Sequence, residues 1–154
     1  MNTVNSVAII GAGNMGSGIA QKSAQEQFDV QMVDREKQWV ERGEKIINDF
    51  LEEAIQRRIF KPEKVEEIKN RITGVIGTEN VAPDTDLVIE AVFEDFEIKK
   101  DVFNILDRVC GEKTILASNT SSLSVNELAK ATGRPEKFVG LHFFYHPAKN
   151  RLIE

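Results

Sequence analysis

Three closely spaced glycines between an apolar run and a helix-forming run constrain the fold of this chain more than any other feature. Residues 7–10 read as a buried strand, Gly11, Gly13 and Gly16 follow at the spacing G-x-G-x-x-G, and residues 15–27 read as a helix. Gly11 permits a tight turn off the strand, Gly13 lets the backbone approach a pyrophosphate, and Gly16 allows close helix–strand packing. We therefore expect a pyrophosphate at the helix N-terminus. The candidate contacts are Gly11, Ala12, Gly13, Asn14, Met15 and Gly16.

An acidic residue follows at the position that such a glycine loop requires. Asp34 closes a second apolar run, residues 30–33. A carboxylate there accepts hydrogen bonds from a ribose 2′-hydroxyl and repels a 2′-phosphate, which favours NAD over NADP. Arg35 leaves NADP open, because its guanidinium is either a ligand for a 2′-phosphate or a solvated surface cation.

Strand-like and helix-like patterns alternate along the rest of the chain. Short apolar runs lie at residues 72–76, 87–91, 114–117 and 138–141, with amphipathic helical patterns between them. We expect an α/β fold of the Rossmann type over residues 1–154, with helices on both faces of a doubly wound parallel sheet of strand order 3-2-1-4-5-6. The runs at 72–76 and 87–91 are expected to be buried strands. Ser124 is expected to cap a helix over residues 125–131.

A helical insertion is expected after the second strand, as a long helix near residues 39–55 and a short one over 63–70. Four cations gather near the end of the long helix: Arg57, Arg58, Lys61 and Lys64. They either offset the negative end of the helix dipole or bind a polyanionic ligand.

Polar residues follow several of the expected strands, at the carboxyl ends where ligands of such sheets bind. Asp34, Glu94, the run 118–122 and His142 all belong to this set. The serines of residues 118–122 have a simpler role open to them, since hydroxyls commonly satisfy loop backbone groups. No Gly-x-Ser-x-Gly elbow surrounds them, which argues against a serine hydrolase.

The last residues have the pattern of a hairpin. If the chain reverses around Ala148, residues whose numbers sum to 296 face each other, and His142 then meets Glu154. A carboxylate there fixes the imidazole tautomer and favours the imidazolium, which suits a general base. The alternative is that His142 has a structural role only, with its ring nitrogens hydrogen-bonded within the fold. His146, beside Pro147 in the turn, is expected to be exposed.

Composition excludes several other classes of protein. The net charge of -5 argues against a nucleic-acid or anionic-membrane surface as the main partner. The single cysteine, Cys110, excludes an internal disulfide and a multi-cysteine metal site, and we expect it to be buried filler. No metal site is expected. We find no signal-peptide leader, in which basic residues precede an apolar run. We also find no apolar run near the ~20 residues that a membrane span needs. Both observations predict a cytoplasmic protein.

Four blocks occur in an order and spacing that resemble a known family. They are Gly-Ala-Gly-Asn-Met-Gly-Ser-Gly-Ile-Ala at 11–20, Glu-Ala-Val-Phe-Glu-Asp at 90–95, Ser-Asn-Thr-Ser-Ser at 118–122 and Gly-Leu-His-Phe-Phe at 140–144. The chain resembles the N-terminal NAD-binding domain of the L-3-hydroxyacyl-CoA dehydrogenases, which include the 3-hydroxybutyryl-CoA dehydrogenases. The resemblance covers nearly the whole chain.

The resemblance implies oxidation of an L-3-hydroxyacyl-CoA to a 3-oxoacyl-CoA with NAD, or the reverse, in fatty-acid or butyrate metabolism. It implies that His142 is the general base, Glu154 its orienting partner and Ser121 a contact of the substrate oxygen. It also implies cofactor contacts by Asp34 and by Val92, Phe93, Glu94, Lys99, Asn119 and Ser121.

Two departures affect the substrate side. The family usually has Asn-Pro after His-Phe-Phe, whereas this chain has Tyr145, His146 and Pro147, which puts the usual contact in doubt at Tyr145. The CoA-binding lysines of the family lie in the helical insertion, where Arg57, Arg58, Lys61 and Lys64 are candidates without one-to-one correspondence.

Family members continue into a helical domain that supplies dimer contacts and part of the acyl-CoA cleft. We therefore expect this chain to be a domain fragment that binds NAD with little or no turnover and leaves an apolar patch uncovered, and the full-length protein to be a homodimer. Two alternatives stay open. One is a non-catalytic NAD-binding module of the crystallin type, and the other is a β-hydroxyacid dehydrogenase acting on free acids.

Overall fold

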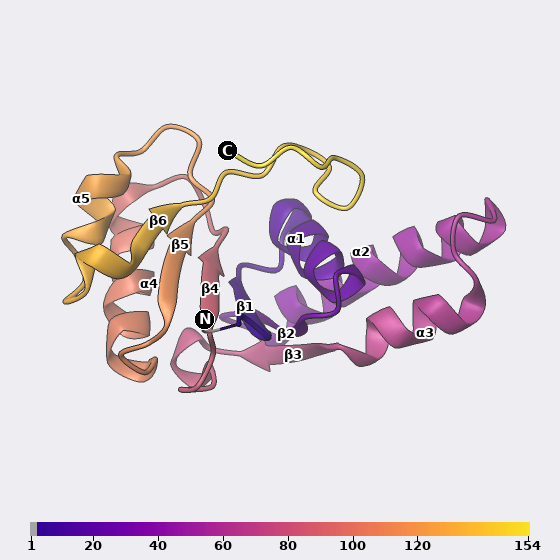
Figure 1. The fold of residues 1–154 in the computed structure, drawn as a ribbon, viewed down its shortest axis with the longest axis horizontal. Helices are drawn as coiled ribbons and strands as arrows, with labels where there is room; N and C mark the ends of the chain where they lie inside the picture. The colour runs from indigo at the N-terminus through magenta and orange to yellow at the C-terminus, as the bar shows by residue number, and fades with distance from the viewer. Residues whose placement is uncertain (1–2) are drawn as a thin grey trace.

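The computed structural model describes residues 3–154, which form one parallel six-stranded sheet with helices on both faces (Figure 1). The strands are β1 (Ser6–Ile10), β2 (Asp29–Asp34), β3 (Ile72–Ile76), β4 (Leu87–Glu90), β5 (Ile115–Ser118) and β6 (Phe138–Gly140). The helices are α1 (Asn14–Gln25), α2 (Lys37–Gln56), α3 (Pro62–Asn70), α4 (Phe96–Val109) and α5 (Val125–Ala129), with 3-10 turns η1 (Thr78–Asn80) and η2 (Pro135–Lys137). The strand order is β3-β2-β1-β4-β5-β6, which confirms the expected order.

Successive side chains of β1 point to opposite faces of the sheet, and the core forms two clusters, one on each face. Val7 and Ile9 of β1 pack with residues of α1, α2 and α3. Ala8 and Ile10 face the other way and pack with residues of α4 and α5. Cys110 belongs to this second cluster, where burial raises the pKa of its thiol, so the expectation of buried filler is confirmed.

The third strand differs from the expectation. β3 was expected to be buried, but it pairs with β2 alone and is the edge of the sheet. Thr73, Gly74 and Ile76 are exposed, and Ile76 keeps 46% of its surface. The apolar, β-branched composition of this run fits an edge strand as well as a central one, which explains the error.

The helical insertion extends beyond the sheet edge, as Figure 1 shows for α2 and α3. α2 buries Val40, Gly43, Ile47 and Leu51 along one stripe and leaves charged residues outside. α3 begins at Pro62, in the first helical turn where a missing backbone N–H costs nothing. Ser124 caps α5 as expected, accepting a hydrogen bond from the Glu127 N–H at 3.3 Å.

The chain after β6 crosses back over α1 as an extended hairpin (yellow in Figure 1). Phe143 and Ile153 form an antiparallel bridge, and the backbones of His142 and Glu154 exchange two hydrogen bonds of 2.9 Å. The expected register, with residue numbers that sum to 296, is confirmed.

Candidate functional site

The glycine loop has the geometry that a bound pyrophosphate needs. Gly11 has φ +105°, and a Cβ there would lie 2.6 Å from the Ala91 carbonyl oxygen. A Cβ on Gly16 would lie 1.7 Å from the Gly11 oxygen, so α1 packs against the loop backbone. A Cβ on Gly13 would meet nothing within 4 Å, which leaves open space over the loop. Gly13 is also the N-cap of α1 and brings no side-chain acceptor, so the free N–H groups of the first turn face this space.

Asp34 is held against the same loop. Its Oδ2 accepts the Ala12 N–H at 2.8 Å, and its Oδ1 accepts the Arg35 N–H at 2.8 Å. Each oxygen keeps a lone pair for a further donor, so the carboxylate fits a ribose diol beside the pyrophosphate. The Arg35 side chain is 75% exposed and its Nε lies 3.5 Å from Glu36.

A buried ion pair lies beneath the ends of the central strands. Lys99 Nζ is 2.6 Å from Glu90 Oε1, and the two side chains are 1% and 0% exposed. Glu90 also accepts the Val92 N–H at 2.7 Å and the Ser118 hydroxyl at 2.6 Å. These donors supply the hydrogen bonds and the opposite charge that a buried carboxylate requires.

Glu90 is a residue that the sequence analysis missed. The available signal was an acid inside the apolar run 87–91 with a lysine on the following helix. Lys99, expected as a cofactor contact, is closed to solvent and also lies 3.2 Å from Glu94 Oε2. Lys99 thus pairs with Glu94, and both residues line the pocket described below.

Glu94 organises the polar loop after β5. Its carboxylate accepts the Thr120 hydroxyl, the Ser121 N–H at 3.1 Å and the Ser122 N–H at 3.3 Å. Burial opposes ionisation, but the Thr120 hydroxyl, Lys99 and the Ser121 N–H lower the pKa of Glu94 to about 2. Glu94 is thus an anion at any physiological pH.

His142 and Glu154 face each other across the hairpin. His142 Nδ1 lies 3.4 Å from Glu154 Oε2, and the two side chains are 28% and 76% exposed. The His142 strand is fixed by hydrogen bonds from the Leu141 N–H to the Ser118 oxygen at 2.9 Å and from the Phe143 N–H to Asn119 Oδ1 at 2.8 Å. Asn119 therefore connects the loop after β5 to the strand that carries the imidazole.

One pocket of about 340 Å³ brings most of these groups together at the carboxyl ends of β4 and β5. Of the residues expected from the sequence, it is lined by Met15, Val92, Glu94, Lys99, Asn119, Ser121, His142 and Tyr145. Ala91, Phe143 and Phe144 complete the lining and were not expected. Met15 belongs both to the glycine loop and to the lining of this pocket, so the loop and the pocket adjoin each other.

Other candidates lie outside the pocket. Phe93 is 78% exposed on the loop after β4. Arg57, Arg58 and Lys61 are exposed where α2 meets α3, and Arg57 pairs with Glu53. His146 was expected to be exposed, which is wrong: its ring is partly buried and stacks on Phe50.

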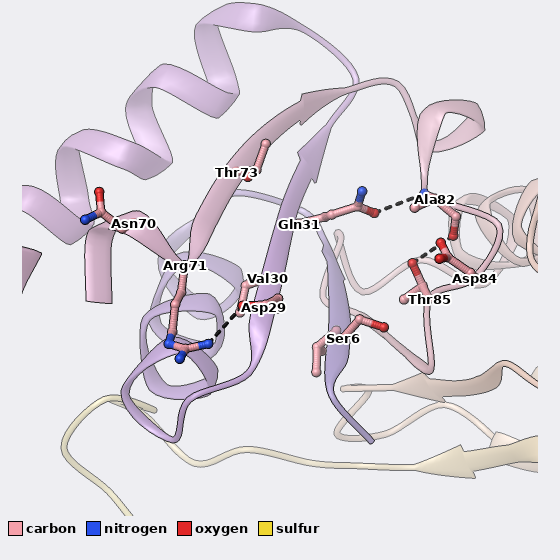
Figure 2. A pocket seen from close by; sticks show the side chains of 11 residues that line it. Ser6, Asp29, Val30, Gln31, Asn70, Arg71, Thr73, Ala82, Asp84 and Thr85 are labelled. Atoms are coloured by element: carbon pink, nitrogen blue, oxygen red, sulfur yellow. Dashed lines mark hydrogen bonds and ion pairs between the residues drawn. The ribbon is translucent and has the colours of Figure 1, made fainter. Parts of the chain in front are cut away.

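A second hollow, of about 260 Å³, lies at the amino ends of the strands, opposite the carboxyl ends where the first pocket lies (Figure 2). Several of its polar side chains bond to one another or to nearby backbone. Arg71 pairs with Asp29 at 2.9 Å, and Gln31 accepts the Ala82 N–H at 3.0 Å. It contains the first residues of β1 and β2, whereas ligands of doubly wound sheets bind at the carboxyl ends.

Within residues 3–154 no cluster of three metal-ligating side chains occurs, and no helix has the length and apolar character to cross a membrane.

Comparison with known proteins gives a consistent result. The family described as 3-hydroxyacyl-CoA dehydrogenase, NAD binding domain, matches residues 6–154. The 3-hydroxybutyryl-CoA dehydrogenase of Clostridioides difficile is 39% identical over 148 residues, which are 96% of this chain and 52% of that protein. The mitochondrial hydroxyacyl-coenzyme A dehydrogenase of Sus scrofa is 36% identical over 98% of this chain and 50% of its own length.

A solved structure agrees with these relatives. The (S)-3-hydroxybutyryl-CoA dehydrogenase of Ralstonia eutropha superposes with a TM-score of 0.94 at 34% identity, over 98% of this chain and 53% of that one. The chain thus spans about half the length of these relatives.

Proposed function

Because this chain belongs to the 3-hydroxyacyl-CoA dehydrogenase family as its NAD-binding domain, we propose that the protein containing it oxidises L-3-hydroxyacyl-CoA to 3-oxoacyl-CoA, or catalyses the reverse reduction. The observation that carries the proposal is the position of His142, which faces Glu154 and lines the same pocket as Ser121 and Asn119.

In this proposal His142 is the general base. If its Nδ1 donates to Glu154, its Nε2 lone pair is free to take the proton of the substrate 3-hydroxyl. The Glu154 carboxylate then stabilises the imidazolium that forms. NAD, when bound, supplies the acceptor for the hydride that leaves C3.

Ser121 is the candidate for holding the substrate oxygen. Its backbone N–H is bonded to Glu94, so its hydroxyl is carried on a fixed loop beside His142. Positioning of this kind supplies much of the rate in such a reaction. Arg57, Arg58 and Lys61 are candidates for the CoA phosphates, and Tyr145, 71% exposed at the pocket, is a candidate for the acyl chain.

The decisive experiment uses the full-length protein. We expect NADH consumption with acetoacetyl-CoA, reduced about 10²- to 10⁴-fold in His142→Gln, with NAD affinity unchanged by calorimetry. Unchanged turnover in this variant would refute the base. NAD binding without turnover in the wild type would favour the non-catalytic module, and turnover of free 3-hydroxy acids alone would favour a β-hydroxyacid dehydrogenase.

We further propose that the 154-residue chain binds NAD with little turnover and that the full-length protein is a homodimer. Support comes from the relatives' greater length and from exposed apolar side chains beside the pocket, with Leu152 at 56% and Ile153 at 45%. A cytoplasmic location stays a prediction from the sequence, since some relatives are named as mitochondrial or peroxisomal.

A further inference from the structure

The turn of the C-terminal hairpin is seated on the helical layer by contacts that no step of the proposed reaction uses. The His146 ring stacks on Phe50 of α2 with centroids 5.0 Å apart and an interplanar angle of 19°. Lys149 Nζ lies over the same phenyl ring, 5.0 Å from its centroid. Stacked rings and cations are both attracted to aromatic rings, so the two contacts together hold the turn on Phe50.

The same turn fits against a glycine of α1. A Cβ on Gly18 would lie 3.0 Å from Pro147 Cδ and 3.4 Å from His146 Cε1. Pro147 is buried at this contact. The missing side chain therefore lets the turn approach the helix closely.

The two strands of the hairpin are held in different ways. The His142 strand is bonded to Ser118 and Asn119 on either side of the imidazole, and Phe143 is 8% exposed. The return strand has no comparable support within the described residues: Leu152 and Ile153 are largely exposed, and Glu154 bonds to His142. An isolated two-stranded hairpin is marginal in water, so a return strand needs the support of its turn.

We propose that the turn anchor, formed by Gly18, Phe50, His146, Pro147 and Lys149, positions Glu154 against His142. Phe50 and Gly18 are positioning residues, because they touch the turn and act on the imidazole through the return strand. His146, directly before Pro147, provides the ring that stacks on Phe50.

The neutral form of His146 suits the anchor. Its Nδ1 accepts the Ala148 N–H at 3.2 Å, which an imidazolium cannot do. Burial and the nearby charge of Lys149 also lower the pKa of His146. Lys149 thus supplies the cation, and the histidine supplies the stacking surface.

The test compares Phe50→Leu, which keeps an apolar side chain but removes the ring, with Phe50→Tyr, which keeps the ring. Amide hydrogen exchange on the 154-residue chain reads out the hairpin directly. We expect the His142 and Glu154 amides to exchange about ten-fold or more faster in Phe50→Leu. The Leu141 amide, bonded to Ser118, serves as an internal reference and should not change, and Phe50→Tyr should resemble the wild type.

Gly18→Ala provides an independent variant, because its new Cβ would lie 3.0 Å from Pro147 Cδ and press on the turn without altering the phenyl ring. It should give the same pattern of exchange. Wild-type protection of the Glu154 amide in both Phe50→Leu and Gly18→Ala would overturn the proposal, and so would equal loss at Leu141, which would indicate general loosening of the domain.

The consequence for turnover rests on the proposed function, whereas the exchange measurement does not. In the full-length enzyme we expect Phe50→Leu to lower kcat about ten-fold with the Kd for NAD unchanged, and Phe50→Tyr to restore it. An inactive wild-type protein with the expected exchange pattern would refute the reaction and leave the anchor in place. A normal kcat with faster exchange would show that the anchor does not serve catalysis.

Discussion

Glu90 and Ser118 occupy paired positions on β4 and β5, and the Ser118 hydroxyl donates to Glu90 Oε2 at 2.6 Å. The last residues of two central strands are thereby joined beneath the pocket. Glu90 Oε1 simultaneously receives Lys99 Nζ from α4. One buried carboxylate therefore connects two strands and a helix at the floor of the site.

We predict that breaking this ion pair from one side destabilises the domain. Lys99→Met leaves the Glu90 carboxylate buried without its cation, which should cost about 3–5 kcal/mol in the free energy of unfolding. Urea titration followed by circular dichroism measures it.

The double variant Glu90→Gln with Lys99→Met should lose less than Lys99→Met alone, because no uncompensated charge remains. Lys45→Met is a surface control, since Lys45 and Asp49 are 73% and 61% exposed, and it should cost at most about 1 kcal/mol. A loss below about 1 kcal/mol for Lys99→Met would contradict the prediction.

Glu94 should make the stability of the domain depend on pH in the acid range. Its pKa is lowered to about 2 in the folded protein from an ordinary value of 4.5. A carboxyl group whose pKa is lower in the folded than in the unfolded protein stabilises the fold. This contribution is complete at pH values above the unfolded pKa, and it is lost as the pH falls from 4.5 toward 2.

The measurement is the free energy of unfolding of wild type and Glu94→Gln across this range. The wild type should be the more stable protein at pH 6, and the difference should shrink as the pH falls below 4.5. A difference that stays constant down to pH 2.5 would show that Glu94 does not carry this charge-dependent stabilisation.

The parts of the structure that the sequence predicted are those fixed by local pattern. The glycine spacing gave the loop before α1, the alternation of runs gave the sheet order, and the turn composition around Ala148 gave the facing of His142 and Glu154. Each depends on residues near one another in the chain, or on a topology rule that holds for the whole fold class.

The parts that were missed depend on residues brought together only by packing. Lys99 was expected as a cofactor contact, and its buried ion pair with Glu90 was missed because only the packing of α4 on β4 brings the two charges together. His146 looks like an exposed turn residue because nothing in the sequence places it on Phe50. The run 72–76 looks buried because it is apolar and β-branched, although the expected strand order already places it at the edge of the sheet, where much of it is exposed.

Two substitutions in the glycine loop should affect stability and NAD binding differently. In Gly16→Ala the new Cβ meets a backbone oxygen at 1.7 Å, so we expect a loss of about 3 kcal/mol or more in stability. In Gly13→Ala the new Cβ meets only open space, so stability should stay within about 1 kcal/mol of the wild type.

If the pyrophosphate lies over the glycine loop, NAD affinity should fall in Gly13→Ala, because the new methyl group would occupy the open space there. We expect a loss of about ten-fold or more in Kd by calorimetry. Undiminished affinity in a folded Gly13→Ala protein would place the pyrophosphate elsewhere.

The carboxylate of Asp34 lies beside the glycine loop at the carboxyl end of β2. If Asp34 holds the adenosine ribose, Asp34→Ala removes charge-assisted hydrogen bonds to it, and NAD binding should weaken by about 1.5–3 kcal/mol. It also removes the charge that repels a 2′-phosphate, so the preference for NAD over NADP should narrow. Asp29→Ala is the matched control, because Asp29 is an exposed acid at the other end of the same strand, paired with Arg71. Calorimetry with both dinucleotides should show wild-type affinities in Asp29→Ala. Equal weakening of NAD binding in the two variants would mean that Asp34 acts through the general stability of β2, with no part in holding the ribose.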